Sequence, residues 1–223
     1  MARLSYPQAG EPRPEALPPA ERTVGQLVAE TIRCYGDRFL AALTLGIGPA
    51  LLAVVIGHVS TREWVLFAPL VAAPILSASY VGACVIALRH TPPPARLVAA
   101  WVAGWVVLAL AELLVFGLIL PALAWLAAVG LVVPVLVVEE RSWRAAFARA
   151  WQLARADYVH ALGSLATLAV LVFLSQTVLV FLLRGAAGAA ISVSYVLANV
   201  VLSPVMFLGA ALLYVDQAAR VKE

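Results

Sequence analysis

Glu112 is the residue whose type and position first point to chemistry, because it lies inside the apolar stretch "WVAGWVVLALAELLVFGLILP". A charge at the centre of a bilayer costs about 2.5–3.5 kcal/mol on insertion scales, so this carboxylate is expected to face polar partners inside a helix bundle. At 1.5 Å per residue, Glu112 and Asn199 lie at a similar depth, roughly 21–22 Å from the ends of their helices. We therefore predict a polar pocket, open to the outer leaflet, in which Glu112 accepts a proton or an ion. Its other predicted members are Gln176, Thr177, Arg184, Ser192, Ser194 and Tyr195. The alternative is a carboxylate that is protonated or hydrogen-bonded for packing alone.

A second group of polar residues lies in "ERSWRAAFARAWQLARADYVH", residues 140–160, which is too charged to cross a bilayer. At 100° per residue its tryptophans, alanines and Leu153 share one face, and Arg141, Arg149 and Gln152 lie opposite. This pattern predicts a helix over 142–156 that lies in the membrane surface. Its predicted lipid contacts are Trp143, Arg144, Phe147, Arg149, Trp151 and Arg155. Such a helix either binds anionic headgroups or a partner protein, or anchors the bundle as a collar.

The segment 23–37, "TVGQLVAETIRCYGD", has the same amphipathic design. Thr23 followed three residues later by Gln26 is typical of a capping box, which predicts that the helix begins there. Each of the two amphipathic helices runs to an aspartate, Asp37 or Asp157, and then into an apolar run. The two segments are therefore candidates for a decayed internal repeat.

Catalytic and metal-binding motifs are not found in the sequence. There is no HExxH, GxSxG, Walker A or GxGxxG motif, and the three histidines are far apart. Cys34 and Cys84 form no CxxC pair, so neither a disulfide nor a metal site is expected, and no cofactor is expected. Glu139 and Glu140 are interpreted as acidic residues that favour the start of the following helix through its dipole.

The composition is that of an integral membrane protein. Of the 223 residues 64% are hydrophobic and only 12% charged, and the mean hydropathy is +0.98. The sequence pI near 9.1 does not indicate nucleic-acid binding, since 14 of the 15 basic residues are arginines that cluster beside the apolar runs.

The apolar runs predict an all-α membrane bundle in one domain, residues 22–218, with the two amphipathic helices on the cytoplasmic face. Residues 1–21 are rich in proline and are expected to form a disordered tail, and 219–223 a short second tail. Gly46 with Ala50, and Ala100 with Gly104, should let helices pack closely, and Pro49, Pro74, Pro134 and Pro204 should kink theirs. The six predicted spans are approximately 39–59, 64–88, 98–118, 120–138, 158–183 and 188–214.

The basic residues also predict the orientation. With both termini in the cytoplasm, only Arg62 and Arg184 of the fifteen basic residues lie outside, as the positive-inside rule favours. The excess of arginine over lysine, with abundant alanine, is associated with GC-rich bacterial genomes. We therefore expect a multi-pass protein of the bacterial plasma membrane.

Three stretches resemble the family named for the membrane domain of glycerophosphoryl diester phosphodiesterases. They are "TVGQLVAETIRCYGDRF", "PVLVVEERSWRAAFARAWQL" and "SPVMFLGAALLYVDQAARVKE". The resemblance implies a six-span helical membrane domain of unestablished activity, sometimes attached to a soluble phosphodiesterase domain. This family often places an arginine almost directly after the aspartate of the last stretch, whereas here Gln217 and two alanines separate Asp216 from Arg220.

The function expected from these features is that of a non-catalytic, lipid-associated or scaffolding membrane module. Transport of a small or lipid-like solute is the alternative, and a lipid-acting membrane enzyme is a third. The expected partners are membrane lipids, anionic at the cytoplasmic face, with a partner protein or a second copy of the chain as a further option and no nucleic acid.

Overall fold

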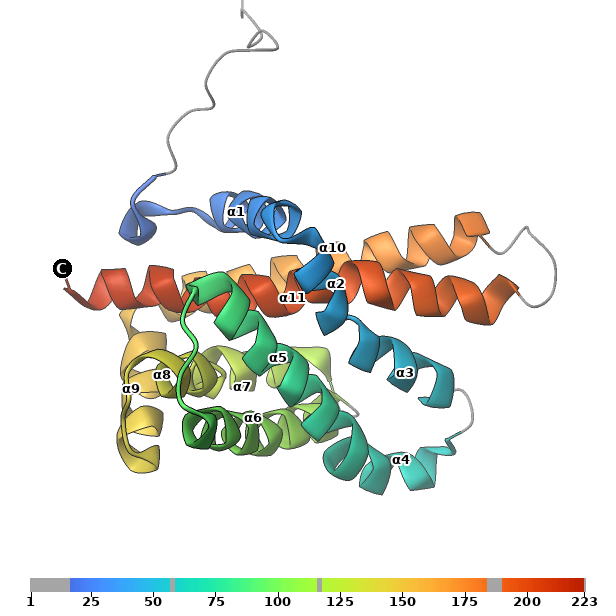
Figure 1. Cartoon of the computed structure of the whole chain (residues 1–223), viewed down its shortest axis with the longest axis horizontal. Coiled ribbons are helices and arrows are strands. Elements are labelled where there is room, and N and C mark those ends of the chain that lie inside the picture. The colour runs from blue at the N-terminus through green and yellow to red at the C-terminus, as the bar shows by residue number, and fades with distance from the viewer. Residues whose placement is uncertain (1–16, 57–58, 116–117, 184–189, 223) are drawn as a thin grey trace, which may run out of the picture.

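The computed structural model describes residues 17–56, 59–115, 118–183 and 190–222, and these residues form helices and no strand (Figure 1). Two helices are amphipathic, and the others are mostly apolar. In chain order the elements are the 3₁₀ turn η1 (Pro19–Glu21), α1 (Val24–Asp37), α2 (Phe39–Leu45), α3 (Ile47–Ile56), α4 (Thr61–Phe67), the π-helical turn η2 (Ala68–Ala72), α5 (Ala73–Leu88), α6 (Pro94–Val115), α7 (Ile119–Val129), α8 (Val132–Val138), α9 (Trp143–Ala156), α10 (Tyr158–Leu183) and α11 (Ala190–Lys222).

Five helical segments of the described chain are long and apolar enough to cross a membrane. They match the second to sixth predicted spans, and the described chain is that of a membrane-embedded protein. The segments are Arg62–Leu88, Pro94–Val115, Ile119–Val138, Tyr158–Leu183 and Val193–Val221.

The first predicted span, 39–59, is not one straight helix. It is divided at Gly46 into α2 and α3. It is long enough to cross a membrane only when α1 is included, and α1 is bent away from it by 106°. A Cβ atom on Gly46 would lie 2.2 Å from the carbonyl oxygen of Val200, so at this point the backbone of α11 touches that of the broken span. The close approach predicted at Gly46 is present, but as the site of a break.

The structure bears out some of the other predicted kinks and chain ends and not others. The chain also breaks at Gly130, shortly before Pro134, and forms the turn η2 before Pro74, whereas α11 continues through Pro204. The hairpin predicted between the third and fourth spans is present, since α6 ends at Val115 and α7 begins at Ile119. The predicted tail at 219–223 is wrong in part, because α11 remains helical to Lys222.

The helical turn η2 is completed by a side chain from the neighbouring helix α6. Pro74 has no N–H, and the N–H of Ala73 bonds to Ala68, so the carbonyl of Pro69 lacks its usual helical donor. The indole Nε1 of Trp105 donates to that carbonyl at 2.6 Å. A helix in a membrane tolerates such a break only where a neighbour satisfies the freed group, and here α6 does so.

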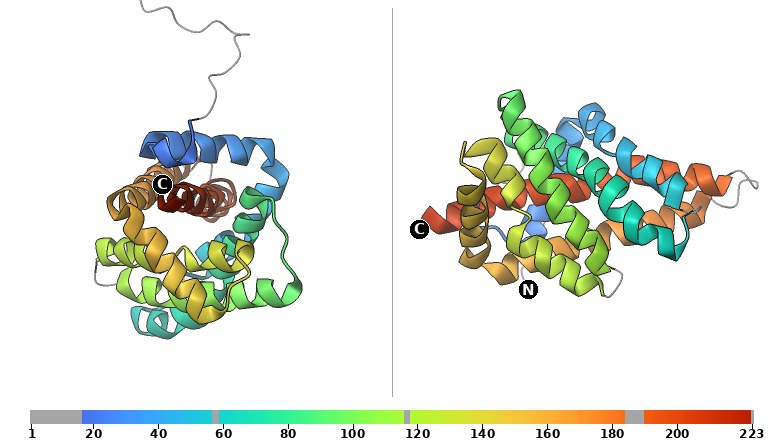
Figure 2. Two further views of the ribbon diagram at one scale, coloured as in Figure 1. Left: turned by 90° about the vertical axis from the view of Figure 1, so that its left-hand side faces the viewer. Right: turned by 90° about the horizontal axis from the view of Figure 1, so that it is seen from below.

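The long helices run roughly along one axis, and α11 packs against α10, α5, α3 and α1. The amphipathic helices α1 and α9 lie across the same end of this bundle (Figures 1 and 2). Their bounds agree closely with the predicted 23–37 and 142–156, and the capping box of Thr23 and Gln26 is formed. The arrangement is that of a helix bundle with two transverse helices at one end.

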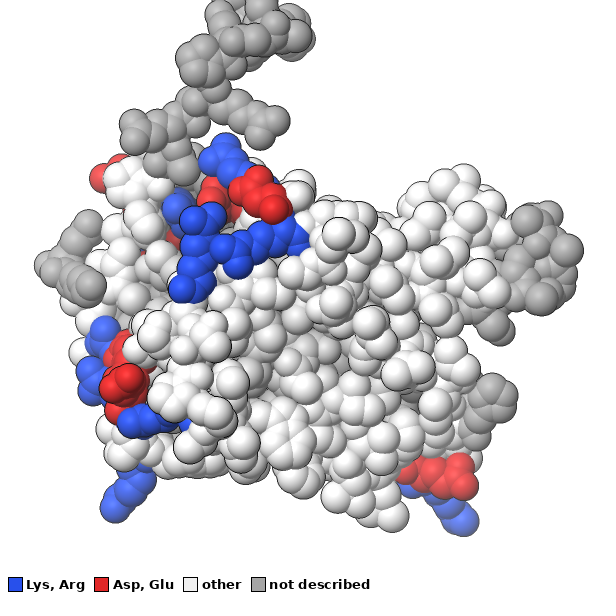
Figure 3. All heavy atoms as spheres, in the orientation of Figure 1, with Lys and Arg blue, Asp and Glu red and all other residues white. Residues whose placement is uncertain are grey.

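Charged side chains gather at that same end. In Figure 3 the blue and red atoms lie mainly on the left, and a smaller group lies at the lower right, where α4 begins. The surface between them is uncharged on the face shown. This separation, with an apolar belt between two charged ends, is what a bilayer requires of a spanning protein.

Candidate functional site

Part of the predicted polar pocket exists as a groove between α10 and α11. Its volume is about 450 Å³. The amide Nε2 of Gln176 donates to Oδ1 of Asn199 at 3.4 Å, and Nδ2 of Asn199 donates to the carbonyl of Tyr195 at 2.9 Å. Four predicted residues are thus brought together, with aromatic and aliphatic neighbours. The lining residues are Phe173, Gln176, Thr177, Val180, Phe181, Tyr195, Ala198 and Asn199.

The prediction that Glu112 belongs to this pocket is wrong. Glu112 does not line the groove, and it lies on α6, which packs mainly against η2, α5, α7 and α8. Counting residues along a helix gives depth, but it does not give the neighbour that a side chain faces. Phe173, Phe181 and Tyr195 are each exposed by half or more, so the groove opens sideways toward lipid and is not an enclosed polar pocket.

The three remaining members of the predicted pocket do not extend the described groove. Ser194 is buried in α11 and does not line the groove. Ser192 lies in the first turn of α11, but its side chain is outside the described part of the structure, and Arg184 lies outside the described residues altogether. The sequence therefore located a real groove but overstated its polarity.

The predicted lipid-facing surface of α9 divides into two parts. Its buried face consists of Ala146, Ala150, Leu153 and Ala154, which are small enough for α9 to approach its neighbours closely. The predicted aromatic contacts lie at the edge of this face. Trp143 and Trp151 are 39% and 49% exposed, Trp143 packs on Phe147 with ring centroids 6.2 Å apart, and Arg155 lies over the ring of Trp151 at 5.9 Å. Together with the exposed Arg144, these residues form a surface suited to a lipid interface.

Arg149 does not belong to that surface, which corrects the prediction. Its side chain is only 14% exposed, and it pairs with Glu139 at 3.3 Å and with Gln152 at 2.9 Å. Glu139, interpreted from the sequence as a dipole partner for the following helix, also has specific side-chain partners. Its carboxylate accepts hydrogen bonds from Arg141 at 2.6 Å and from Tyr214 of α11 at 3.0 Å.

The last turns of α11 form a polar junction that the sequence analysis did not identify. Arg22, before α1, pairs with the fully buried Asp216 at 3.1 Å. Gln217 donates to the carbonyl of Asp157 at 3.0 Å, and Arg220 pairs with the Asp157 carboxylate and donates to the carbonyl of Arg22 at 2.8 Å. The junction therefore joins the end of α11 to the residue before the capping box of α1 and to the residue between α9 and α10. The spacing of Asp216 and Arg220, one helical turn apart, was the available signal, but it does not identify partners more than 60 residues away.

The junction also contains buried polar atoms without a hydrogen-bond partner among the described residues. They include Nε2 of His160 and Oδ2 of Asp216, which are 3.9 Å apart, and Oε1 of Gln217. Unpaired buried groups are rare in native proteins. In this structure they lie where three segments of the chain converge, namely the residue before α1, the start of α10 and the end of α11.

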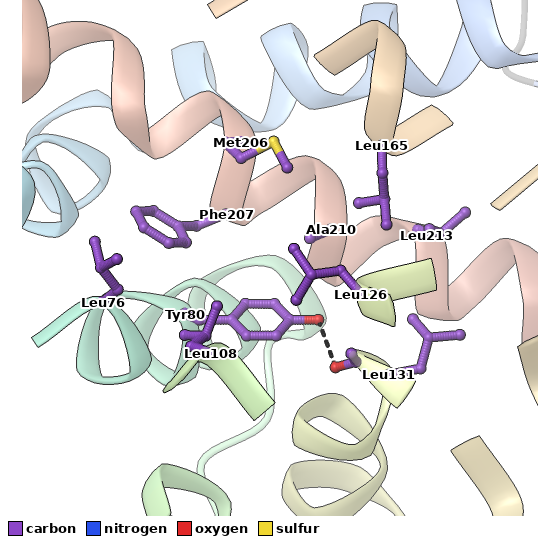
Figure 4. A pocket seen from close by; sticks show the side chains of 11 residues that line it. Leu76, Tyr80, Leu108, Leu126, Leu131, Leu165, Met206, Phe207, Ala210 and Leu213 are labelled. Atoms are coloured by element: carbon purple, nitrogen blue, oxygen red, sulfur yellow. Dashed lines mark hydrogen bonds between the residues drawn. The ribbon is translucent and has the colours of Figure 1, made fainter. Parts of the chain in front are cut away.

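The interior of the bundle contains an apolar cavity of about 230 Å³ (Figure 4). Its walls come from α5, α6, α7, α10 and α11 and from the break after α7. Tyr80 brings the one hydroxyl group of the lining, and this hydroxyl donates to the carbonyl of Gly130 at 3.2 Å. The lining residues are Leu76, Tyr80, Leu108, Leu126, Gly130, Leu131, Leu165, Met206, Phe207, Ala210 and Leu213.

Among the described residues, no three His, Cys, Asp or Glu side chains lie close enough together to hold a metal ion. Cys34 and Cys84 are not joined in a disulfide. No protein-family model, curated protein or solved structure was found to match this chain.

Proposed function

We propose that the protein is a lipid-associated membrane module that binds an apolar ligand, such as a lipid acyl chain, and does not transform it. The observation that carries this proposal is the interior cavity, whose walls are almost entirely aliphatic and aromatic. Apolar cavities of about 150 Å³ already take small apolar molecules, and this cavity is larger. The Tyr80 hydroxyl is already bonded to Gly130, so the cavity offers an occupant apolar contact and no free hydroxyl.

The surface of the bundle supports the same role. Trp143, Trp151, Arg144 and Arg155 lie exposed on α9, across the end where charges gather. Arginines near a bilayer surface attract anionic lipids by about 1 kcal/mol each, and tryptophans favour the headgroup region. We propose that this end faces the cytoplasm in a bacterial plasma membrane. We also propose that the chain is a member of the membrane-domain family that it resembles.

Replacement of Ala210 by leucine tests the binding role, because the larger side chain projects into the cavity. We expect the wild-type protein, purified in mild detergent, to retain an apolar ligand in a fixed ratio to the protein. The Ala210→Leu variant should lose this ligand and gain about 0.5–2 kcal/mol of stability, because the leucine fills the cavity. The measurement is mass spectrometry of extracted lipids together with thermal unfolding.

The matched control is Ala148→Leu, the same change on the exposed surface of α9. It should leave the bound ligand unchanged. Equal ligand content in all three proteins contradicts binding in the cavity. If purified protein in proteoliposomes instead moves a solute across the bilayer, and Ala210→Leu stops that movement, the transport alternative replaces the binding role.

A further inference from the structure

A second cavity lies at the charged end of the bundle, between the end of α1, the end of α5 and the side of α11. Its volume is about 230 Å³. Three apolar residues and a thiol contribute to its lining, and the remaining lining residues carry charges of both signs. The lining residues are Glu30, Cys34, Asp37, Arg38, Ile86, Ala87, Arg89 and Leu212.

The lining holds two carboxylates and two guanidinium groups, but one of the carboxylates is shared with an arginine outside the lining. Glu30 is already paired with Arg33 at 3.4 Å. Within the described part of the chain, the side chains of Arg38 and Arg89 form no ion pair or hydrogen bond, and both residues are exposed. When Arg33 is counted with its partner Glu30, the cavity and its rim carry one positive charge more than negative, and the guanidinium groups of Arg38 and Arg89 keep free donors.

The backbone of Arg89 supplies independent evidence. Arg89 follows the last residue of α5 in the left-handed conformation, with φ 52° and ψ 36°. This position after a helix is usually glycine, because a Cβ atom makes the conformation unfavourable. Strained residues cluster at ligand sites, and here the strain places a guanidinium at a cavity where glycine would have none.

We propose that this cavity binds the phosphodiester of a phospholipid headgroup, with Arg38 and Arg89 as its hydrogen-bond donors. The planar guanidinium has donors spaced to bind phosphate oxygens in pairs. The apolar lining residues Ile86, Ala87 and Leu212 lie beside the charges, as a lipid with a polar head and an apolar body requires. The inference deepens the proposed lipid association by naming a headgroup site, but it does not depend on the interior cavity.

Cys34 is a built-in reporter for this site. It lines the cavity and is half-buried, whereas Cys84 is fully buried. Burial raises the pKa of the Cys34 thiol, so alkylation with a maleimide should be followed at about pH 8, with the label located by peptide mass. A phospholipid in the cavity should slow the reaction at Cys34, while Cys84 stays unlabelled as long as the protein remains folded.

The decisive variant is Arg89→Gly, since glycine suits the left-handed backbone and lacks the guanidinium. We expect full folding, judged by the protection of Cys84, and a phospholipid concentration for half-protection of Cys34 that is at least about tenfold higher. Arg38→Gln should act in the same direction. Arg62→Gln, at the opposite end of the bundle, should change nothing.

Several outcomes overturn the proposal. Unchanged protection of Cys34 in Arg89→Gly rules out Arg89 as a donor. Equal protection by an uncharged diacylglycerol shows that the apolar part of the lipid shields Cys34 and that the phosphate is not bound. Equal protection by inorganic phosphate at the same concentration assigns the site to free phosphate. The Ala210→Leu variant should keep protection of Cys34, so failure of the interior cavity and failure of the headgroup site can be told apart.

Discussion

Five arginines of the described residues form two groups that differ in burial. Arg22, Arg149 and Arg220 are 13%, 14% and 17% exposed, and each holds a carboxylate from another segment. Arg38 and Arg89 are exposed and have no such partner among the described residues. The first group joins helices to one another, and the second is left for ligands.

The ion pairs of Glu139 with Arg141 and Arg149 make the stability of the protein depend on pH. Burial opposes its ionisation, but hydrogen bonds from Arg141 and Tyr214 and the charge of Arg149 lower its pKa below the ordinary value of 4.5. Because the pKa is lower in the folded state, the stabilisation is complete above about pH 4.5 and is lost as the pH falls through the folded value. Glu139→Gln should therefore lower the free energy of unfolding at pH 7 by about 1.5–3 kcal/mol.

The measurement is the temperature of unfolding in detergent between pH 7 and pH 3. The difference in unfolding temperature between wild type and Glu139→Gln should become smaller below about pH 4.5. There the unfolded wild type binds a proton first, and the folded wild type follows at lower pH. Glu140→Gln is the control, since that side chain is exposed. A gap that stays constant with pH would show that the ionised carboxylate contributes nothing.

The partners of Glu139 could not be predicted from the sequence. Glu139 and Arg149 are ten residues apart, and neither a helical wheel nor a charge count indicates that the chain turns between α8 and α9 to bring them together. Tyr214 lies 75 residues from Glu139. A partner at that separation is determined by the packing of whole helices, and a single sequence does not contain this information.

At the scale of helices, Gly46 lies against α11 with less room for a Cβ atom than any other glycine of the described residues. An alanine there would place its Cβ 2.2 Å from the carbonyl oxygen of Val200, and the obstacle is backbone, which cannot rotate away. Gly46→Ala should cost about 1–3 kcal/mol or more through overpacking. The measurement is thermal unfolding of the purified protein.

Gly36 provides the matched control. It lies in α1 with nothing within 4 Å of an added Cβ, so Gly36→Ala should stabilise the protein by about 0.5–1 kcal/mol through helix propensity. If both variants change stability by similar amounts, the contact between α11 and the broken span is not as close as described.

The helices that were predicted accurately are those that depend on residues only a few positions apart. The start of α1 follows from its capping box, and α9 follows from its amphipathic period, because both depend on neighbours within a few residues. The break at Gly46 could not be predicted in the same way. Gly46 lies against Val200 of α11, about 150 positions away in the sequence, and no local pattern indicates that contact.

At the scale of the molecule, the gathering of charge at one end agrees with the predicted cytoplasmic face, and labelling can decide the orientation. In a variant without Cys34 and Cys84, we expect Arg62→Cys to react with an impermeant maleimide in intact cells. Thr91→Cys and Ser142→Cys should react only after permeabilisation. All three positions are exposed. Labelling of Ser142→Cys in intact cells would reverse the orientation.

The ion pair between Arg22 and Asp216 has a consequence for the order of events during synthesis. The two residues are 194 positions apart. At about 5–20 residues per second, roughly 10–40 s pass between their appearance. During that interval Arg22 and Asp157 have no ion-pair partner, because both partners lie on α11, whereas Glu139 already has Arg141 and Arg149. A chain stopped before α11 therefore exposes unpaired charges at two places, which marks it as incompletely folded for the proteases that remove such chains.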